Sequence, residues 1–345
     1  MKLFPSLCAL LVLSGSATAQ LVVPISQDRS VSGSGDLFGP ETVSESDADQ
    51  AVDFSPFVSN AAVTVDNGFA LGSGGGIQDS QLLAASVVAS GSAFANGESY
   101  DFDWDGSASG RSELIYEFTL TAKSSYQITG DIAAYDNGSS LVFLLQNSMF
   151  LSGESAAGPS EEIVLNLSGI LDPGDYELVV RASGGAYGSG FYFDYAFAAY
   201  DVLFELTALS ASYCVAAANS VGPGANLALS GSQSIAVNDF HLESSGGIPN
   251  GFGLFYYGPN QVQASFGDGF RCVGGMTHRL FPLVQNDGSG LASRHVDFTV
   301  GNPSMGSGQI LPNSTWNFQH WYRDAMGPGG TGFNVSDGLS VTFCD

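Results

Sequence analysis

Apolar and polar residues alternate with a period of two along most of this chain. Clear examples lie at residues 114–120, 163–167 and 296–300, where large apolar side chains recur at every second position. This period is typical of a β-strand that buries one face, because successive side chains of a strand point to opposite sides. No stretch after residue 19 sustains a period of 3.6, so the pattern predicts an all-β protein.

Two short polar segments predict tight turns between strands. They are Asp66-Asn67-Gly68 and Asp136-Asn137-Gly138. The dipeptide Asn-Gly accepts the positive φ angles that a primed turn requires. Both segments therefore predict β-hairpins.

Residues 191–206 contain a change of phase. Large apolar side chains occupy odd positions as far as Phe197 and even positions from Tyr200 onward. One regular strand cannot bury both sets, because a shift by one residue moves every side chain to the other face. We expect either a bulge or sheet crossing near Ala198 and Ala199, or two strands separated by a bend.

The first nineteen residues have the features of an export signal. Lys2 supplies a positive charge, residues 7–13 form a short apolar run, and Ala17-Thr18-Ala19 fits a small-residue cleavage pattern. We therefore expect an exported protein that is extracellular or located at the cell surface. No later stretch approaches the ~20 apolar residues of a spanning helix, so no transmembrane segment is expected in the mature chain.

Composition changes along the chain and suggests its division into parts. Residues 20–60 are rich in acidic residues, serine and glycine, and we expect them to be extended or loosely attached. All four histidines, and all three cysteines that follow the signal, lie after residue 210. This step predicts two β-sandwich domains in tandem, jelly-roll or immunoglobulin-like, at residues 61–210 and 211–345.

The net charge excludes one class of partner. The chain has 34 acidic and 9 basic residues, a formal charge of −25, and its only lysines are Lys2 and Lys123. Contacts with phosphates need clustered basic residues, so no nucleic-acid partner is expected. With 44% hydrophobic residues the chain is also too apolar for a disordered acidic tail.

Several longer segments together support a resemblance. In the C-terminal part they are residues 219–224 (NSVGPG), 253–258 (GLFYYG), 266–275 (FGDGFRCVGG), 315–324 (TWNFQHWYRD) and 334–341 (NVSDGLSV). They resemble a C-terminal module of uncharacterised exported proteins of planctomycete-type bacteria, and the match spans nearly all of residues 213–345. Residues 134–138, 171–176 and 195–200 are similar to a companion region of such proteins. The resemblance implies an extracellular β-rich protein and no established activity.

Three cysteines remain after the signal, namely Cys214, Cys272 and Cys344. They allow one intramolecular disulfide, and the sequence alone leaves all three pairings open. In sequences that the chain resembles, the first two occur together, which implies a Cys214–Cys272 bond with Cys344 free. The alternative bond, Cys214–Cys344, would join the first and last strands of the domain.

Asp101, Asp103 and Asp105 have the spacing of the first ligands of a calcium loop. The twelfth position of such a loop is Ser112 here, where an acidic ligand would be required. The alternative is a strand that buries the aromatic residues at positions 100, 102 and 104 and leaves the three aspartates in solvent. Calcium is the one cofactor that the sequence suggests.

Aromatic side chains are the remaining candidates for ligand binding. Alternation in residues 315–324 places Trp321 and Arg323 on the face opposite Trp316, so one of these faces lies outside the core. Sugar-binding sandwiches stack pyranose rings on Trp or Tyr beside polar groups. We take Trp321, Arg323 and Tyr256 as candidate binding residues, with core packing of these rings as the alternative.

No linear signature of an enzyme is present. The patterns G-x-S-x-G and H-E-x-x-H are absent, and His320 shares the apolar face of Trp316, as expected of a core residue. We therefore expect a non-catalytic binding, adhesion or structural protein whose partner is an extracellular glycan or another surface protein. The alternative is a carbohydrate-active or other hydrolase that uses a carboxylate pair, although no pair stands out in the sequence.

Overall fold

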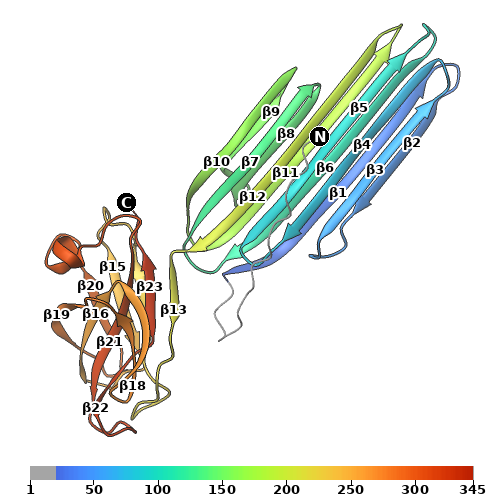
Figure 1. The fold of residues 1–345 in the computed structure, drawn as a ribbon. Coiled ribbons are helices and arrows are strands. Elements are labelled where there is room, and N and C mark those ends of the chain that lie inside the picture. The colour runs from blue at the N-terminus through green and yellow to red at the C-terminus, as the bar shows by residue number, and fades with distance from the viewer. Residues whose placement is uncertain (1–20, 345) are drawn as a thin grey trace.

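A computed structural model describes residues 21–344 and shows an all-β protein. Two bodies follow each other along the chain, a long one at residues 22–208 and a shorter one at residues 210–344 (Figure 1). Both contain antiparallel sheets packed face to face, which confirms the prediction of tandem β-sandwiches. The signal predicted at residues 1–19 lies outside the described residues. No helix within residues 21–344 has the length and apolar character needed to cross a membrane.

The N-terminal sandwich consists of two six-stranded antiparallel sheets. The first has the order β2-β1-β6-β11-β8-β9, and these strands span Val43–Gln50, Val22–Phe38, Asp105–Leu120, Gly174–Ser189, Gly138–Gln146 and Met149–Ala157. The second has the order β10-β7-β12-β5-β4-β3, and these strands span Ser160–Leu171, Ser124–Asp136, Phe193–Ala208, Ser86–Ser99, Ala70–Leu82 and Phe57–Asp66.

The C-terminal domain has one larger sheet with a smaller sheet against each face. The larger sheet follows the order β13-β23-β21-β16-β19, with β22 paired to β21, and these strands span Ser210–Tyr213, Gly338–Thr342, Thr315–Asp324, Phe252–Gly258, His278–Gln285 and Gly332–Val335. The three-stranded sheet consists of β14 (Asn226–Gly231), β15 (Phe240–Ser245) and β20 (Ala292–Val296). A hairpin comprises β17 (Asn260–Phe266) and β18 (Gly269–Gly274), and two 3₁₀ turns span Asn302–Ser304 and Gly306–Gly308.

The interior of the N-terminal sandwich tapers from one end to the other. Along β6 the inward-facing residues are small from Gly106 to Ser112 (Gly106, Ala108, Gly110, Ser112) and large from Leu114 to Leu120 (Leu114, Tyr116, Phe118, Leu120). At the wide end the rings of Phe118 and Phe204 lie 5.8 Å apart across the two sheets. Large side chains therefore form the main core at one end, and along β6 small residues fill the other end, where Leu37, Val63 and Val65 form a smaller cluster between β1 and β3.

At the narrow end the two sheets are in backbone contact. A Cβ atom added to Gly74 of β4 would lie 2.1 Å from the carbonyl oxygen of Ser109 on β6, and one added to Gly72 would lie 2.3 Å from that of Ser107. Sheets in ordinary sandwiches are ~10 Å apart with side chains between them. Glycine is required here because the facing backbone occupies the space of a side chain.

The structure corrects the expectation that residues 20–60 are loosely attached. β1 is an internal strand of the first sheet, paired with β2 on one side and with β6 on the other. The fully buried side chain of Arg29 donates hydrogen bonds to the carbonyls of Asp53 (2.5 Å) and Ser55 (2.8 Å) and so fixes the segment after β2. Glycine occupies positions 33 and 35 because this strand lies in the narrow part of the sandwich, where Gly33 meets Gly74 and Gly35 meets Gly72.

The expected break in residues 191–206 is also wrong. β12 is one continuous strand, in unbroken register with β5 and β7. Its even positions face inward throughout, and Ala196 and Ala198 are the inward residues at the narrow end. Phe193 and Tyr195 lie outside because the interior has no room for rings there, where a Cβ atom on Gly184 would already lie 2.8 Å from that of Ala196.

One of the two predicted hairpins is confirmed and the other is corrected. The Asp66-Asn67-Gly68 segment joins paired strands β3 and β4, with Gly68 at φ 83°. The Asp136-Asn137-Gly138 segment instead carries the chain from β7 in the second sheet to β8 in the first. The dipeptide Asn-Gly indicates a sharp reversal but does not indicate whether the next strand pairs in the same sheet.

We expect Gly74→Ala to destabilise the N-terminal sandwich by about 3 kcal/mol or more, because the added methyl group overlaps the backbone of β6. Gly185→Ala is the matched control, since its Cβ atom would face solvent with only the Ala108 carbonyl near it, at 3.8 Å. Its effect should stay within about 0.5 kcal/mol. Scanning calorimetry of both variants makes the test, and equal melting temperatures would contradict the backbone-contact interpretation.

Candidate functional site

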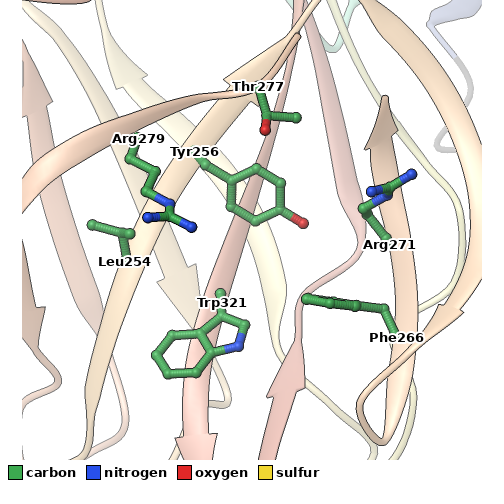
Figure 2. A pocket seen from close by; sticks show the side chains of 7 residues that line it. All are labelled: Leu254, Tyr256, Phe266, Arg271, Thr277, Arg279 and Trp321. Atoms are coloured by element: carbon green, nitrogen blue, oxygen red, sulfur yellow. The ribbon is translucent and has the colours of Figure 1, made fainter. Parts of the chain in front are cut away.

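A cavity of ≈ 420 Å³ opens between the large C-terminal sheet and the β17–β18 hairpin. Figure 2 shows its side chains converging from the sheet and from the hairpin. Three aromatic rings, two guanidinium groups, one hydroxyl and one aliphatic side chain line it, from Tyr256, Phe266, Trp321, Arg271, Arg279, Thr277 and Leu254. The cavity thus combines apolar ring faces with groups that donate hydrogen bonds.

The sheet wall is made by neighbouring positions on three strands. In the antiparallel register Tyr256 of β16 lies opposite Arg279 of β19, and Leu254 lies opposite Trp321 of β21. Trp316 of the same strand β21 points the other way, into the main core, with 9% of its surface exposed. The predicted division of β21 into a core face and an outer face is therefore confirmed.

The hairpin wall carries Phe266 from β17 and Arg271 from β18. Phe333 of β22 lies between the two walls, with its ring centroid 5.1 Å from that of Phe266 and 5.7 Å from that of Trp321. These ring contacts connect hairpin and sheet, so the aromatic faces at the cavity are supported from behind.

A buried amide fastens the hairpin to the sheet. Gln319, fully buried on β21, accepts hydrogen bonds from the Tyr256 hydroxyl (2.5 Å) and the Cys272 amide (2.9 Å). Its own amide group donates to the carbonyls of Phe270 (2.8 Å) and Ser336 (2.6 Å). The carbonyl and the amino group of this side chain are thus both fully hydrogen-bonded, and these bonds hold β18 against β16, β21 and the segment before β23.

A disulfide ties the same hairpin to the residue that follows β13, the first strand of the domain. Cys214 and Cys272 are bonded, as the resemblance implied, and Cys344 is free. The Tyr213 hydroxyl adds a 2.9 Å hydrogen bond to the Cys272 carbonyl. Because Cys272 directly follows Arg271, this linkage fixes the backbone that carries one guanidinium of the cavity.

The charges at the cavity are unbalanced. Neither the Arg271 nor the Arg279 side chain makes an ion pair or a hydrogen bond with any described part of the chain, and no acidic residue lines the cavity. Burial raises the pKa of Tyr256 well above its usual value, although the charge of Arg271 opposes this shift. The phenol therefore stays neutral, and its ring edge and face are what it offers to a ligand.

The structure brings two of the three predicted binding residues together. Trp321 and Tyr256 both line the cavity, whereas Arg323 lies exposed two residues farther along β21, opposite Phe333 and outside the lining. Sequence reasoning missed Arg271 and Arg279. Alternation along β18 and β19 indicates their faces, but only the folded hairpin shows that both point into one cavity.

The structure corrects the strand proposed as the alternative to the calcium loop. Residues 100–104 form a loop between β5 and β6, with 81% of the Phe102 surface exposed, so they are not a strand with buried rings. No set of three or more acidic, histidine or cysteine side chains within residues 21–344 lies close enough to hold a metal ion, which includes Asp101, Asp103 and Asp105. Side-chain hydrogen bonds from Ser189 and Tyr187 lower the pKa of Asp105.

A second group of exposed aromatic residues lies at the narrow end of the N-terminal sandwich. Phe102 and Phe191 meet edge to face, with ring centroids 4.9 Å apart. Backbone hydrogen bonds from Tyr100 to Phe69 (2.8 Å) and from Ser99 to Tyr192 (3.1 Å) bring the neighbouring loops together. These rings are exposed on loop tips and line none of the described cavities.

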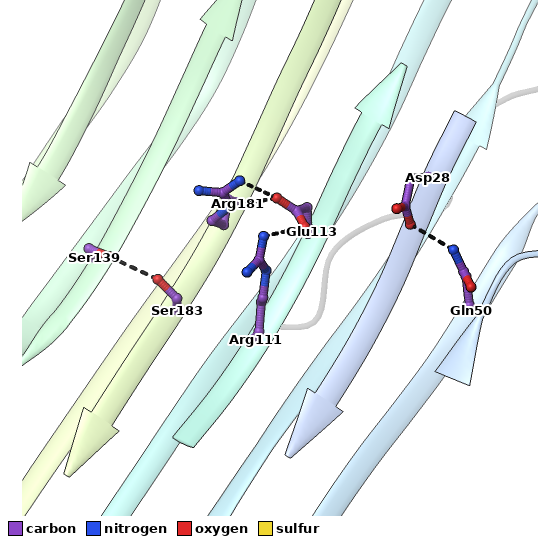
Figure 3. Close-up of polar contacts among 7 residues, drawn as sticks. All are labelled: Asp28, Gln50, Arg111, Glu113, Ser139, Arg181 and Ser183. Atoms are coloured by element: carbon purple, nitrogen blue, oxygen red, sulfur yellow. Dashed lines mark hydrogen bonds and ion pairs between the residues drawn. The ribbon is translucent and has the colours of Figure 1, made fainter. Parts of the chain in front are cut away.

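Basic residues of the N-terminal domain are neutralised within the fold. On the outer face of the first sheet, Glu113 lies between two arginines (Figure 3), at 2.5 Å from Arg111 Nη2 and 2.6 Å from Arg181 Nε. Lys123 pairs with Asp172 at 3.1 Å. Arg111, Arg181 and Lys123 are therefore all paired within the chain, and none of these three cations is free to bind a ligand.

An acidic hollow of ≈ 390 Å³ lies on the outer face of the second sheet. Asp131 of β7 and Asp201 of β12 are direct cross-strand partners there, and Asp79 of β4 lies farther along the same hollow. Burial, followed by the charge of Asp131, raises the pKa of Asp201. Like charges opposite each other destabilise a sheet. Glu117 and Glu177 are also cross-strand partners, and the position of Asp131 and Asp201 in a hollow distinguishes this pair.

Two buried ionisable groups lie in the C-terminal core. His320 is fully buried, stacks on Phe255 at 4.3 Å and has no hydrogen-bond partner on either ring nitrogen, and burial lowers its pKa to about 3. Asp337 accepts a hydrogen bond from the Leu227 amide (2.6 Å), and burial raises its pKa to about 6. The prediction that His320 is a core residue is confirmed.

No protein-family model and no curated protein matches this chain. It is similar to a solved structure of β-glucuronidase 2 from Bacteroides uniformis, at 11% identity and a TM-score of 0.17 over 68% of this chain and 26% of that one. It is also similar to a GH2 β-galacturonidase from Eisenbergiella tayi, at 12% identity and a TM-score of 0.17 over 67% and 36%. The chain spans only these minor fractions of both enzymes, and TM-scores this low carry no argument about function.

We expect the two buried groups to give opposite pH dependences. Native His320 stays neutral while the unfolded side chain binds a proton below pH 6.5, so its contribution to stability is complete above pH 6.5 and falls by about 3 kcal/mol by pH 4. Native Asp337 binds its proton first, so its contribution rises by about 2 kcal/mol as the pH falls from 6 to 4.

Urea unfolding at pH 7 and pH 4 checks this. Asp337→Asn should lose more stability on acidification than the unaltered chain, and His320→Leu should lose less. Tryptophan fluorescence follows the transition, since Trp316 lies in the same core. Parallel pH profiles for all three proteins would contradict the assignment.

Proposed function

We propose that this is an exported, non-catalytic binding protein whose C-terminal domain holds an extracellular saccharide in the cavity between sheet and hairpin. The observation that carries the proposal is the position of Trp321. Its strand already supplies Trp316 and Phe318 to the main core, yet Trp321 lines a cavity on the opposite face together with Tyr256. Aromatic rings at an open cavity are the surfaces on which pyranose rings stack.

The dimensions and rigidity of the cavity favour a small ligand. A volume of ≈ 420 Å³ falls within the range of small-molecule sites. Gln319, the Cys214–Cys272 bond and the ring contacts of Phe333 hold both walls in place before any ligand arrives. Binding to such a preorganised site loses little conformational entropy of the protein, which favours useful affinity from a modest contact area.

The lining favours binding over catalysis. General acid–base chemistry requires a carboxylate, imidazole or similar group within hydrogen-bond reach of the reacting atom. The side chains that line this cavity carry no carboxylate, imidazole or thiol. Arginine, threonine and aromatic residues suit recognition of a ligand that leaves unchanged.

A second candidate function rests on the acidic hollow of the N-terminal domain. Glycosidases use two carboxyl groups with different pKa values, one as acid and one as nucleophile or base. Asp131 and Asp201 face each other in a hollow, and the pKa of Asp201 is raised. This pair is the most suitable one for the hydrolase alternative.

We expect Trp321→Ala to weaken saccharide binding at least tenfold, about 1.4 kcal/mol, because the ring that stacks on the sugar is lost. The measurement is a glycan array followed by isothermal titration of the best ligand with the full chain. Phe252→Ala is the matched control, since that exposed ring lies in the same domain outside the cavity and its loss should leave affinity unchanged. Absence of saccharide binding, or equal loss in both variants, would refute the proposal.

We expect the purified chain to release no reducing sugar from the saccharides it binds. Hydrolysis that is retained in Asp79→Asn but abolished in both Asp131→Asn and Asp201→Asn would establish the alternative instead. Asp79 is the control because it shares the hollow but is not the cross-strand partner of Asp131.

A further inference from the structure

Arginine residues in this protein fall into two groups. Arg29, Arg111, Arg181 and Arg294 all donate hydrogen bonds to carboxylates, amides or carbonyls of the chain. The side chains of Arg271, Arg279 and Arg323 have no such partner within residues 21–344, and of these three Arg271 and Arg279 line the cavity. The chain contains 34 acidic residues, and none of them lines this cavity.

The C-terminal domain carries much less negative charge than the rest of the chain. Residues 211–345 contain four arginines and eight acidic residues, so most of the net charge of −25 lies in the N-terminal part. At physiological ionic strength the interaction between exposed charges more than ~8 Å apart is largely screened. An anion at the cavity is therefore affected mainly by the two arginines that line it. The strongly acidic remainder does not prevent local anion binding.

The geometry points to a saccharide that carries an anionic substituent, a carboxylate or a sulfate, as the ligand of the cavity. This inference rests on the proposed saccharide-binding function and adds its chemical class. In Figure 2 Arg271 and Arg279 lie on either side of the Tyr256 ring, with Trp321 near the ring and Thr277 at one end. A sugar ring placed over the aromatic residues therefore brings a charged substituent toward one guanidinium or the other.

The chemistry of arginine fits this role. Its planar guanidinium binds carboxylate and sulfate oxygens through two parallel hydrogen bonds and is more weakly hydrated than an ammonium group. Arg279 lies directly opposite Tyr256 in the sheet register, and Arg271 is fixed by the disulfide that follows it. Two positioned donors beside ring faces would discriminate a charged sugar from its neutral counterpart.

Titration of the full chain with matched pairs of oligosaccharides tests the inference. One pair is an oligomannuronate and its carboxyl-reduced neutral form, and the other is a sulfated galactan oligosaccharide and its desulfated form. We expect at least one charged member to bind tenfold or more tighter than its neutral counterpart. Arg271→Gln and Arg279→Gln should each remove most of that preference, and comparison of the two pairs identifies the anion.

Arg323→Gln is the matched control, because this arginine is on the same sheet face but outside the cavity, and it should leave the preference intact. Equal affinity for charged and neutral members would overturn the anionic class while the saccharide proposal stood. Loss of the preference in Arg323→Gln as well would also overturn it. No binding of any oligosaccharide would refute the proposed function itself. Unchanged melting temperatures of the variants show that the fold is kept.

Discussion

Backbone contact between the two sheets at the narrow end decides where the large side chains of the N-terminal domain lie. The facing backbones leave no volume for a methyl group at Gly72 or Gly74, so large side chains are excluded from the space between β4 and β6 at that end. They lie instead in the wide half, around Phe118 and Phe204, in a smaller cluster of Leu37, Val63 and Val65 between β1 and β3, or outside on loop tips. The high glycine content of the chain thus has a structural role within its strands.

The C-terminal domain meets a different constraint, because its large sheet is covered on both faces. The three-stranded sheet closes the hydrophobic core on one face, and the β17–β18 hairpin partly covers the other. A partly covered face leaves a cavity only where the cover is held at a fixed distance. Gln319 and the Cys214–Cys272 bond provide that fixed attachment, so the site depends on buried groups that do not line it.

Local patterns predicted what depends on single strands and failed where two sheets interact. Alternation gave the all-β class and the two faces of β21, and the resemblance gave the disulfide. The change of phase in β12 led to the wrong prediction of a break because alternation places large residues in the core. In the structure Ala196 and Ala198 face the narrow interior and Tyr195 does not. The Asp136 turn misled because a turn signal does not say which sheet receives the next strand.

In the candidate site, too, the face on which a residue lies was predictable from its strand, whereas the set of residues that meet at the cavity was not. Trp321 and Tyr256 follow from alternation and from the known use of aromatic rings in sugar binding. Arg323 shares the face of Trp321 but lies beyond the cavity, since alternation gives the face of a residue and not the extent of the hairpin above it. Arg271 and Arg279 come from strands that meet at the cavity only in the folded domain.

The strand order of the N-terminal sandwich has a consequence for the folding pathway. β3, β4 and β5 are consecutive and paired, so this meander closes with short loops, whereas the 17 residues of β1 pair with β6, with Val22 opposite Leu120. Long-range pairing of this kind slows folding because loop entropy is lost before contacts form. β1 also has no partner on its β6 side until residues 105–120 have been made. The order in which the chain is synthesised therefore differs from the order in which its sheets can close.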